Sequence, residues 1–127
     1  MKDAQRAEEV VAAQLRSEGW EILARNWRRR GCELDIVARR LQILAFIEVK
    51  FRRSYRPFAS EIATMLNAKK IAALKRGALL FLAAHNLREI HSIRGDLAVV
   101  TCFPQKRSQN TKEHDIKIHY YNNILPL

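Results

Sequence analysis

The most constraining feature of the sequence is a pair of neighbouring segments, 33–39 and 43–51, that contain the stretches ELDI and IEVK. Charged and apolar residues alternate in both stretches. Successive side chains of a strand point to opposite faces, so this period of two predicts two strands that each have an apolar face. A short connection separates the segments, which predicts an antiparallel hairpin whose apolar face packs against a helix.

The register of this hairpin follows from its turn. If the chain folds between Leu41 and Gln42, Asp35 lies opposite Glu48, and Glu33 lies opposite Lys50. The reverse face then consists of three apolar pairs: Leu34 with Val49, Ile36 with Ile47, and Ala38 with Ala45. A slip by two residues would keep the faces and change the partners, whereas a slip by one would bury the charges. We therefore expect three acids and a lysine on one face.

Acids in this arrangement predict a metal site. Two carboxylates on directly opposed residues, with Cβ atoms about 5 Å apart, repel each other unless a cation lies between them. Mg²⁺ or Mn²⁺ is typically held by one or two carboxylates, water and substrate phosphate oxygens, and Asp35 and Glu48 could supply the carboxylates. Lys50 on the same face would steady an attacking water or the charge on a phosphate. Glu33 is either a further ligand or a partner for Lys50 or a nearby arginine.

The charge of the chain predicts a polyanionic partner. Lys and Arg number 23 against 13 Asp and Glu, a net charge of +10. Nucleic acid is favoured over a membrane surface, because the densest basic region has the pattern of strands and turns and not of an amphipathic helix. The only acids between residues 22 and 56 are the three of the predicted site. The cations that we expect to contact the nucleic-acid backbone are Arg25, Arg28, Arg29, Arg30, Arg52, Arg53 and Lys70.

Length and patterning predict one domain over residues 1–127, with an α/β sandwich around a mixed sheet. The expected helices are 3–17 and 60–84, the further expected strands are 20–27, 89–92, 96–103 and 115–121, and a mobile loop is expected at 104–113. Gly77 inside the second helix predicts a close packing contact.

Cys32 and Cys102 lack the spacing of a zinc site, and we expect two buried free thiols. No apolar run is long enough to span a membrane and no signal peptide is visible, so we expect a cytoplasmic protein.

The segments 31–39, GCELDIVAR, and 46–50, FIEVK, resemble the YraN-like family of small bacterial proteins, whose signature is a GEIDLIA strand followed by FVEVK. The resemblance covers nearly the whole chain. It implies a restriction-endonuclease-like fold of the PD-(D/E)XK nuclease superfamily, near the archaeal Holliday-junction resolvases. The chain departs from the family pattern at Cys32, which replaces a glycine, and at residues 40–42, which lack a common acid.

The resemblance also implies roles for individual residues. The D, E and K of the superfamily correspond to Asp35, Glu48 and Lys50, and a metal-binding glutamate of the first helix is matched by Glu8. It implies a Mg²⁺- or Mn²⁺-dependent endonuclease that acts on DNA, with branched or junction DNA as a candidate substrate and a homodimer as a candidate assembly. Two alternatives stay open: a nucleic-acid-binding protein that kept the fold without cutting, and a basic structural protein of a ribonucleoprotein.

Overall fold

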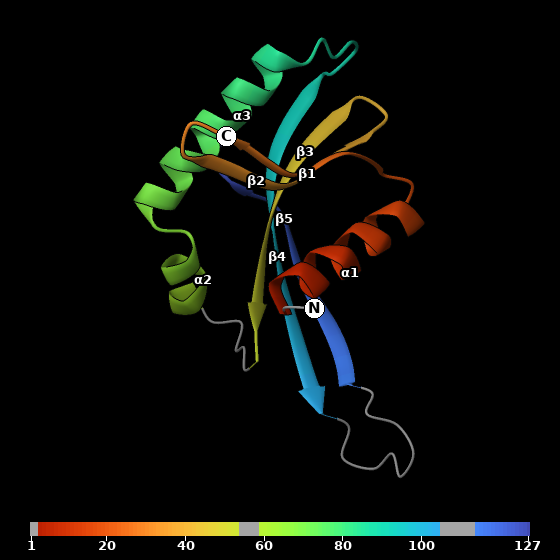
Figure 1. Ribbon diagram of the computed structural model, residues 1–127, viewed down its shortest axis with the longest axis vertical. Helices are drawn as coiled ribbons and strands as arrows, with labels where there is room; N and C mark the ends of the chain where they lie inside the picture. Colours follow the sequence, from red (N-terminus) through yellow and green to blue (C-terminus); the bar gives the residue numbers. More distant parts are fainter. Residues whose placement is uncertain (1–2, 54–58, 105–113) are drawn as a thin grey trace.

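The computed structural model describes residues 3–53, 59–104 and 114–127 as a sheet with helices on both faces (Figure 1). The elements in chain order are α1 (Asp3–Ser17), β1 (Glu21–Arg29), β2 (Cys32–Arg40), β3 (Ile43–Arg52), α2 (Ala59–Met65), α3 (Ala68–Ala84), β4 (Ser92–Pro104) and β5 (His114–Leu125). The predicted α/β sandwich around a mixed sheet is confirmed, and it is consistent with a restriction-endonuclease-like architecture.

The five strands of the sheet lie in chain order, β1-β2-β3-β4-β5. The β3–β4 pair is parallel and the other three pairs are antiparallel. A parallel pair needs a crossover connection, and α2 and α3 lie on the crossover from β3 to β4. β5 is an edge strand of this sheet, in the region where a strand is predicted at 115–121.

Each face of the sheet has its own core. On one face α1 packs through Ala7, Val11 and Leu15 against a cluster that includes Ile36 and Ile47. On the other face α3 packs through Leu74, Ala78 and Phe81 against a cluster of sheet residues, Leu34, Val37, Leu44 and Phe46. The alternation of β3 therefore divides its apolar residues between two helices, and both faces of its centre are covered.

The predicted hairpin register is confirmed near the turn. The confirmed pairs are Ile36 with Ile47 and Ala38 with Ala45. The predicted pair of Leu34 with Val49 is wrong, because Leu34 packs in the core under α3 and Val49 in the core under α1. The predicted opposition of Asp35 and Glu48 is likewise absent from the ladder, since Asp35 lies beyond its last pair. The pairing of β2 with β3 stops at Ile36, and beyond it the β1–β2 hairpin curls away toward α3 (Figure 1).

The helical region after β3 differs from the single helix that the sequence predicts over residues 60–84. It consists of α2 and α3, and Asn67 is the N-cap of α3, where its side chain accepts a hydrogen bond from the Lys70 backbone N–H. The expected close contact at Gly77 is confirmed, since a Cβ there would lie 3.0 Å from Leu34 Cδ2.

The remaining predictions have mixed outcomes. The short strand predicted at 89–92 is wrong up to His91, because β4 is one continuous strand that begins at Ser92. The loop predicted at 104–113 falls outside the described residues, apart from Pro104 at the end of β4. Cys32 is a buried free thiol, as expected, and the side chain of Cys102 lies outside the part of the chain that the structure describes. No helix in the described ranges is long and apolar enough to cross a membrane.

Candidate functional site

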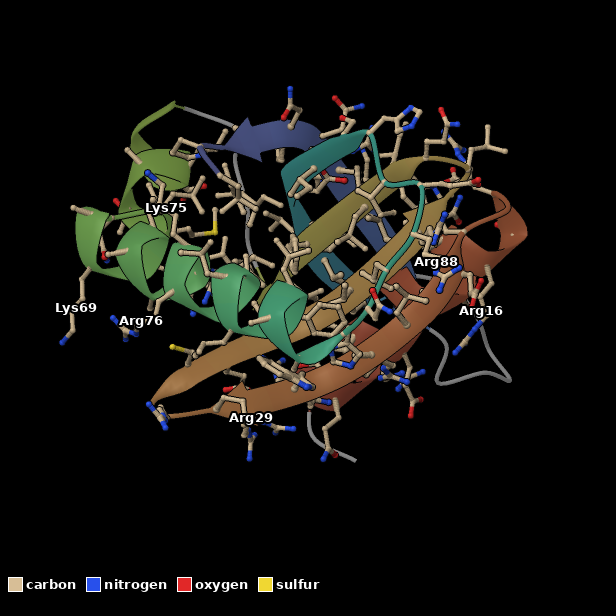
Figure 2. All side chains as sticks on the ribbon, turned by 90° about the horizontal axis from the view of Figure 1, so that it is seen from above. Arg16, Arg29, Lys69, Lys75, Arg76 and Arg88 are labelled. Carbon is tan, nitrogen blue, oxygen red and sulfur yellow. The ribbon has the colours of Figure 1, made fainter. Side chains whose placement is uncertain are left out.

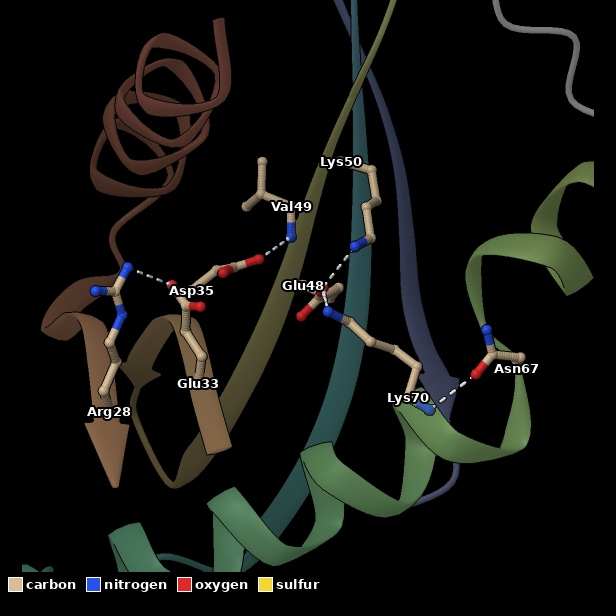
Figure 3. Close-up of polar contacts among 8 residues, drawn as sticks. All are labelled: Arg28, Glu33, Asp35, Glu48, Val49, Lys50, Asn67 and Lys70. Atoms are coloured by element: carbon tan, nitrogen blue, oxygen red, sulfur yellow. Dashed lines mark hydrogen bonds and ion pairs between the residues drawn. The ribbon is translucent and has the colours of Figure 1, made fainter. Parts of the chain in front are cut away.

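Asp35 lies where β2 separates from β3. Its Oδ2 accepts a hydrogen bond from the Val49 backbone N–H at 2.8 Å, just beyond the last regular β2–β3 pair (Figure 3). The β1–β2 register likewise passes over Asp35, from the pair at Ile36 to the pair at Leu34. The Asp35 carboxylate thus accepts the hydrogen bond that a backbone carbonyl of β2 would otherwise accept from β3. Its other oxygen, Oδ1, does not take part in this bond.

Glu48 is the next acid of the site and is almost completely buried, at 2% exposure. Its Oε1 lies 3.1 Å from the Lys50 Nζ and 2.8 Å from the Lys70 Nζ (Figure 3). A buried carboxylate is tolerated only when it is paired, and here two ammonium groups from β3 and α3 pair with one oxygen. The sequence predicts the nearness of Lys50, but it does not predict that of Lys70.

Glu8 enters the site from α1. The helix turns its apolar residues Ala7 and Val11 onto the sheet, which leaves Glu8 half-buried beside them. Its Oε1 is buried and has no hydrogen-bond partner. Few buried polar atoms in folded proteins lack a partner, so this oxygen is available for a ligand.

The charges of the three acids affect one another. Burial raises the pKa of Asp35, and the nearby charges of Glu48 and Glu8 raise it further, to about 7, against the opposing effects of the Val49 N–H and of Lys70. For Lys70, burial alone would lower the pKa, but the hydrogen bond and charge of Glu48 outweigh it and raise the pKa above its ordinary value. The acidic neighbours thus add to the effect of burial on the pKa of Asp35, and Lys70 only partly opposes them.

Glu33 lies apart from this cluster. The predicted Glu33–Lys50 pair is wrong: the Glu33 carboxylate lies 3.2 Å from the Arg28 guanidinium on the neighbouring strand, and both side chains are exposed (Figure 3). This contact is the arginine alternative that the sequence leaves open.

Apart from Lys70 and Arg25, the predicted backbone-contacting cations fall into two separate groups. Arg28, Arg29 and Arg30 lie at the tip of the β1–β2 hairpin and are exposed. Arg52 and Arg53 lie at the end of β3, where Arg53 is 3.4 Å from Asp3 at the start of α1. Arg25 is half-buried in β1, and its Nε has no hydrogen-bond partner.

Two further cations, on α3, extend the group at the hairpin tip. Lys69 and Arg76 are exposed and project from one side of α3, whereas Lys75 projects from another side (Figure 2). The Arg76 Nε lies 3.0 Å from the Cys32 Sγ, so α3 touches the hairpin next to its arginines. Lys69 and Arg76 are not among the cations that the hairpin pattern predicts, although the sequence carries a signal: five cations and no acid occur from residue 67 to residue 88.

The acids have the chemistry of a hard-cation site. Asp35, Glu48 and Glu8 offer carboxylate oxygens, the ligands that Mg²⁺ and Mn²⁺ prefer, and one of these oxygens lacks any partner. As their side chains stand in the described ranges, no three His, Cys, Asp or Glu residues form a ready metal-holding group. These carboxylate oxygens could hold a divalent ion if Glu48 gave up one of its two lysine contacts to bind it.

The fold and the site define a class: an α/β protein with a mixed sheet and, where two of its strands separate, a buried glutamate surrounded by half-buried acids and lysines. The chain belongs to the uncharacterised protein family UPF0102, whose sequence model matches residues 7–100. This membership agrees with the YraN-like resemblance.

Individual UPF0102 proteins align with most of the chain. The protein from Carboxydothermus hydrogenoformans is 32% identical over 95% of this chain and 92% of its own length. The protein from Nocardia farcinica is 42% identical over 79% of this chain and 76% of its own length. The protein from Granulibacter bethesdensis is 36% identical over 84% of this chain, and the alignment covers 65% of that longer protein.

Proposed function

We propose that this protein is an endonuclease that hydrolyses phosphodiester bonds in DNA with Mg²⁺ or Mn²⁺. The observation that carries the proposal is the incomplete neutralisation of three clustered acids. Glu8 has a buried oxygen without a partner, and the pKa of Asp35 is raised to about 7 by burial and by its acidic neighbours. Such perturbed groups cluster at functional sites, and a divalent cation would relieve the repulsion.

The chemistry divides among the residues of the site. Asp35, Glu48 and Glu8 would hold the ion, which when bound supplies Lewis-acid activation of the phosphodiester and of the attacking water. Lys50 lies on the strand that carries Glu48, with its Nζ 3.1 Å from the Glu48 Oε1. From there its ammonium group would donate hydrogen bonds to the charge that develops on the phosphate.

The exposed cations would bind the nucleic-acid backbone. Arg28 to Arg30 at the hairpin tip and Lys69 and Arg76 on the adjoining side of α3 form a continuous candidate surface, which we call the α3–hairpin surface. Neutralised phosphates release counterions, so DNA binding through this surface would weaken steeply with salt even in a variant that does not cut. Branched or junction DNA is the substrate class that the resolvase resemblance favours.

A panel of branched, nicked and linear DNA incubated with Mn²⁺ tests the proposal. The wild-type protein is expected to cut at least one of these substrates, and Glu48→Gln is expected to cut it at least 100-fold more slowly. Glu9→Gln is the matched control, because Glu9 is exposed on α1 beside Glu8. Equal cutting by wild type and Glu48→Gln would overturn the catalytic assignment.

The same panel separates the alternative functions. Tight, salt-sensitive DNA binding without cutting by the wild type would favour a nucleic-acid-binding protein that does not cut. Equal affinity for RNA and DNA without cutting would favour a ribonucleoprotein component. A homodimer that cuts both strands would appear as double-strand breaks and as twice the monomer mass in solution.

A further inference from the structure

Lys70 connects α3 with the acidic site. Its backbone N–H donates a hydrogen bond to the Asn67 side chain at 2.9 Å, which fixes the first turn of the helix (Figure 3). Its side chain extends from that turn to Glu48, with 2.8 Å between Nζ and Oε1, and is 41% exposed. The ammonium group can therefore move into solvent while the helix and its cap stay in place.

The other lysine on Glu48 has a less exposed side chain. Lys50 belongs to β3, pairs with Val99 in the parallel ladder, and has a side chain that is 23% exposed. Both ammonium groups contact the same Glu48 oxygen. A divalent ion on this oxygen would be repelled by both lysines, and Lys70 has the easier path away.

The stability of α3 does not explain a lysine at this position. Lys69 and Lys70 lie in the first turn of a helix that has no acid there. Cations near a helix N-terminus are disfavoured by the helix dipole. The contact that compensates for this placement is the one between Lys70 and buried Glu48.

We propose that Lys70 is an exchangeable counter-cation: it neutralises Glu48 in the metal-free protein and leaves it when a divalent ion binds. The inference rests on the proposed function, because it requires a divalent ion at Asp35 and Glu48. Lys70 therefore acts through Glu48 as a competitor of the ion: its ammonium group neutralises the buried carboxylate until the ion replaces it. Displacing the Lys70 ammonium group from Glu48 then costs free energy, and this cost lowers the affinity of the protein for the ion.

Calorimetric titration with Mn²⁺, without nucleic acid, tests the exchange. Lys70→Met removes the competing charge and is expected to bind Mn²⁺ at least tenfold more tightly than the wild type. Lys70→Arg restores a cation and is expected to return the affinity to within threefold of the wild type. Lys75→Met is the matched control, since Lys75 is exposed on another side of α3, and its affinity is expected to be unchanged (Figure 2).

A merely structural Lys70 would give the opposite result, because the loss of its contact would disorder Glu48 and weaken Mn²⁺ binding. Equal or weaker Mn²⁺ binding by Lys70→Met therefore overturns the inference. If Lys70→Met does not fold, Lys70→Gln, which is neutral and can still donate to Glu48, decides by the same criterion. If the wild type binds Mn²⁺ and Lys70→Met and Lys70→Gln bind it with the same affinity, the exchange of Lys70 is refuted but the metal site is not. If the wild type does not bind Mn²⁺, the proposed metal site is refuted as well.

Discussion

Two buried acidic sites lie on the same sheet, and they are neutralised in different ways. Asp96 on β4 is fully buried, yet both of its oxygens have donors. Its Oδ1 accepts from the Asn123 backbone N–H at 2.7 Å, and its Oδ2 accepts from the Tyr120 hydroxyl. The Arg94 guanidinium lies 3.2 Å away, above the ring of Trp20.

In the cluster of Asp35, Glu48 and Glu8, by contrast, not every carboxylate oxygen has a partner. Its two lysines gather on one oxygen of Glu48, while a buried oxygen of Glu8 has no partner. Around Asp96 the chain supplies every group that the carboxylate needs, which is the arrangement of a structural site. Around Asp35 the described residues leave a buried oxygen of Glu8 without a partner, and the proposed metal site depends on this difference.

Removal of the Asp96 carboxylate has the largest expected effect. Asp96→Ala leaves Arg94, the Tyr120 hydroxyl and the Asn123 N–H without their acceptor, and it should lower the free energy of unfolding by about 3–5 kcal/mol. Urea unfolding at pH 7 measures this loss. Asp3→Asn, at an exposed ion pair, should change stability by less than about 0.5 kcal/mol. A similar, small effect of both variants would contradict a structural role for Asp96.

The pH dependence of the metal-free protein should be set partly by Asp35. Its pKa is about 7 in the folded protein against 3.8 for an ordinary aspartate, so the folded state keeps a proton that the unfolded chain releases. The stabilisation from that proton is complete below about pH 4 and is lost as the pH rises through 7, with a slope of at most about 1.4 kcal/mol per pH unit.

Urea unfolding at pH 4 to 8, with a chelator present to keep the protein metal-free, measures how the free energy of unfolding depends on pH. The advantage of Asp35→Asn over the wild type should grow with pH, because asparagine keeps the acceptor for the Val49 N–H and carries no charge. A stability difference between the two proteins that is constant over this pH range would be the contrary result.

A milder change at the Asp96 site should still destabilise the protein. Burial, together with the hydrogen bond and charge of Asp96, raises the pKa of the Tyr120 hydroxyl well above its ordinary value, so the hydroxyl remains a donor. Tyr120→Phe removes that donor and should cost about 1–2 kcal/mol in thermal or urea unfolding. A stabilised variant would show that the hydroxyl is not needed by Asp96.

Glu8→Gln should have the smallest effect, with the opposite sign. The substitution removes a partly buried charge that has an unpartnered oxygen, so the metal-free protein should gain about 0.5–1 kcal/mol at pH 8. Glu9→Gln, at the exposed neighbouring position, should leave stability unchanged within about 0.5 kcal/mol. A loss of stability in Glu8→Gln would assign Glu8 to the structural class of Asp96.

The parts of the fold that depend on local patterns could be predicted from the sequence. The period of two and the short turn give the register at Ile36 and Ile47, because a slip by one residue would exchange the two faces. The sequence does not predict the break between α2 and α3, since apolar spacing alone does not show that Asn67 caps a new helix. The pattern of a flat strand groups Leu34 with Val49, whereas the hairpin curls toward α3 and buries Leu34 in the other core.

The candidate site was predictable only in part, for the same reason. Asp35, Glu48 and Lys50 lie close in the hairpin, so their spacing along two strands was enough to group them. The contact of Lys70 with Glu48 and the buried network of Asp96 join elements that are distant in sequence. Such contacts depend on how α3 and β5 pack on the sheet, and no local pattern contains that information.

Calorimetric titration of the wild-type protein and of Asp35→Asn with Mn²⁺ tests the central claim most directly. If the acids at the point where β2 separates from β3 bind a divalent cation, the wild type binds Mn²⁺, and Asp35→Asn binds it at least tenfold more weakly while remaining folded. Absence of binding to the wild type, or equal affinity of the two proteins, would contradict the account.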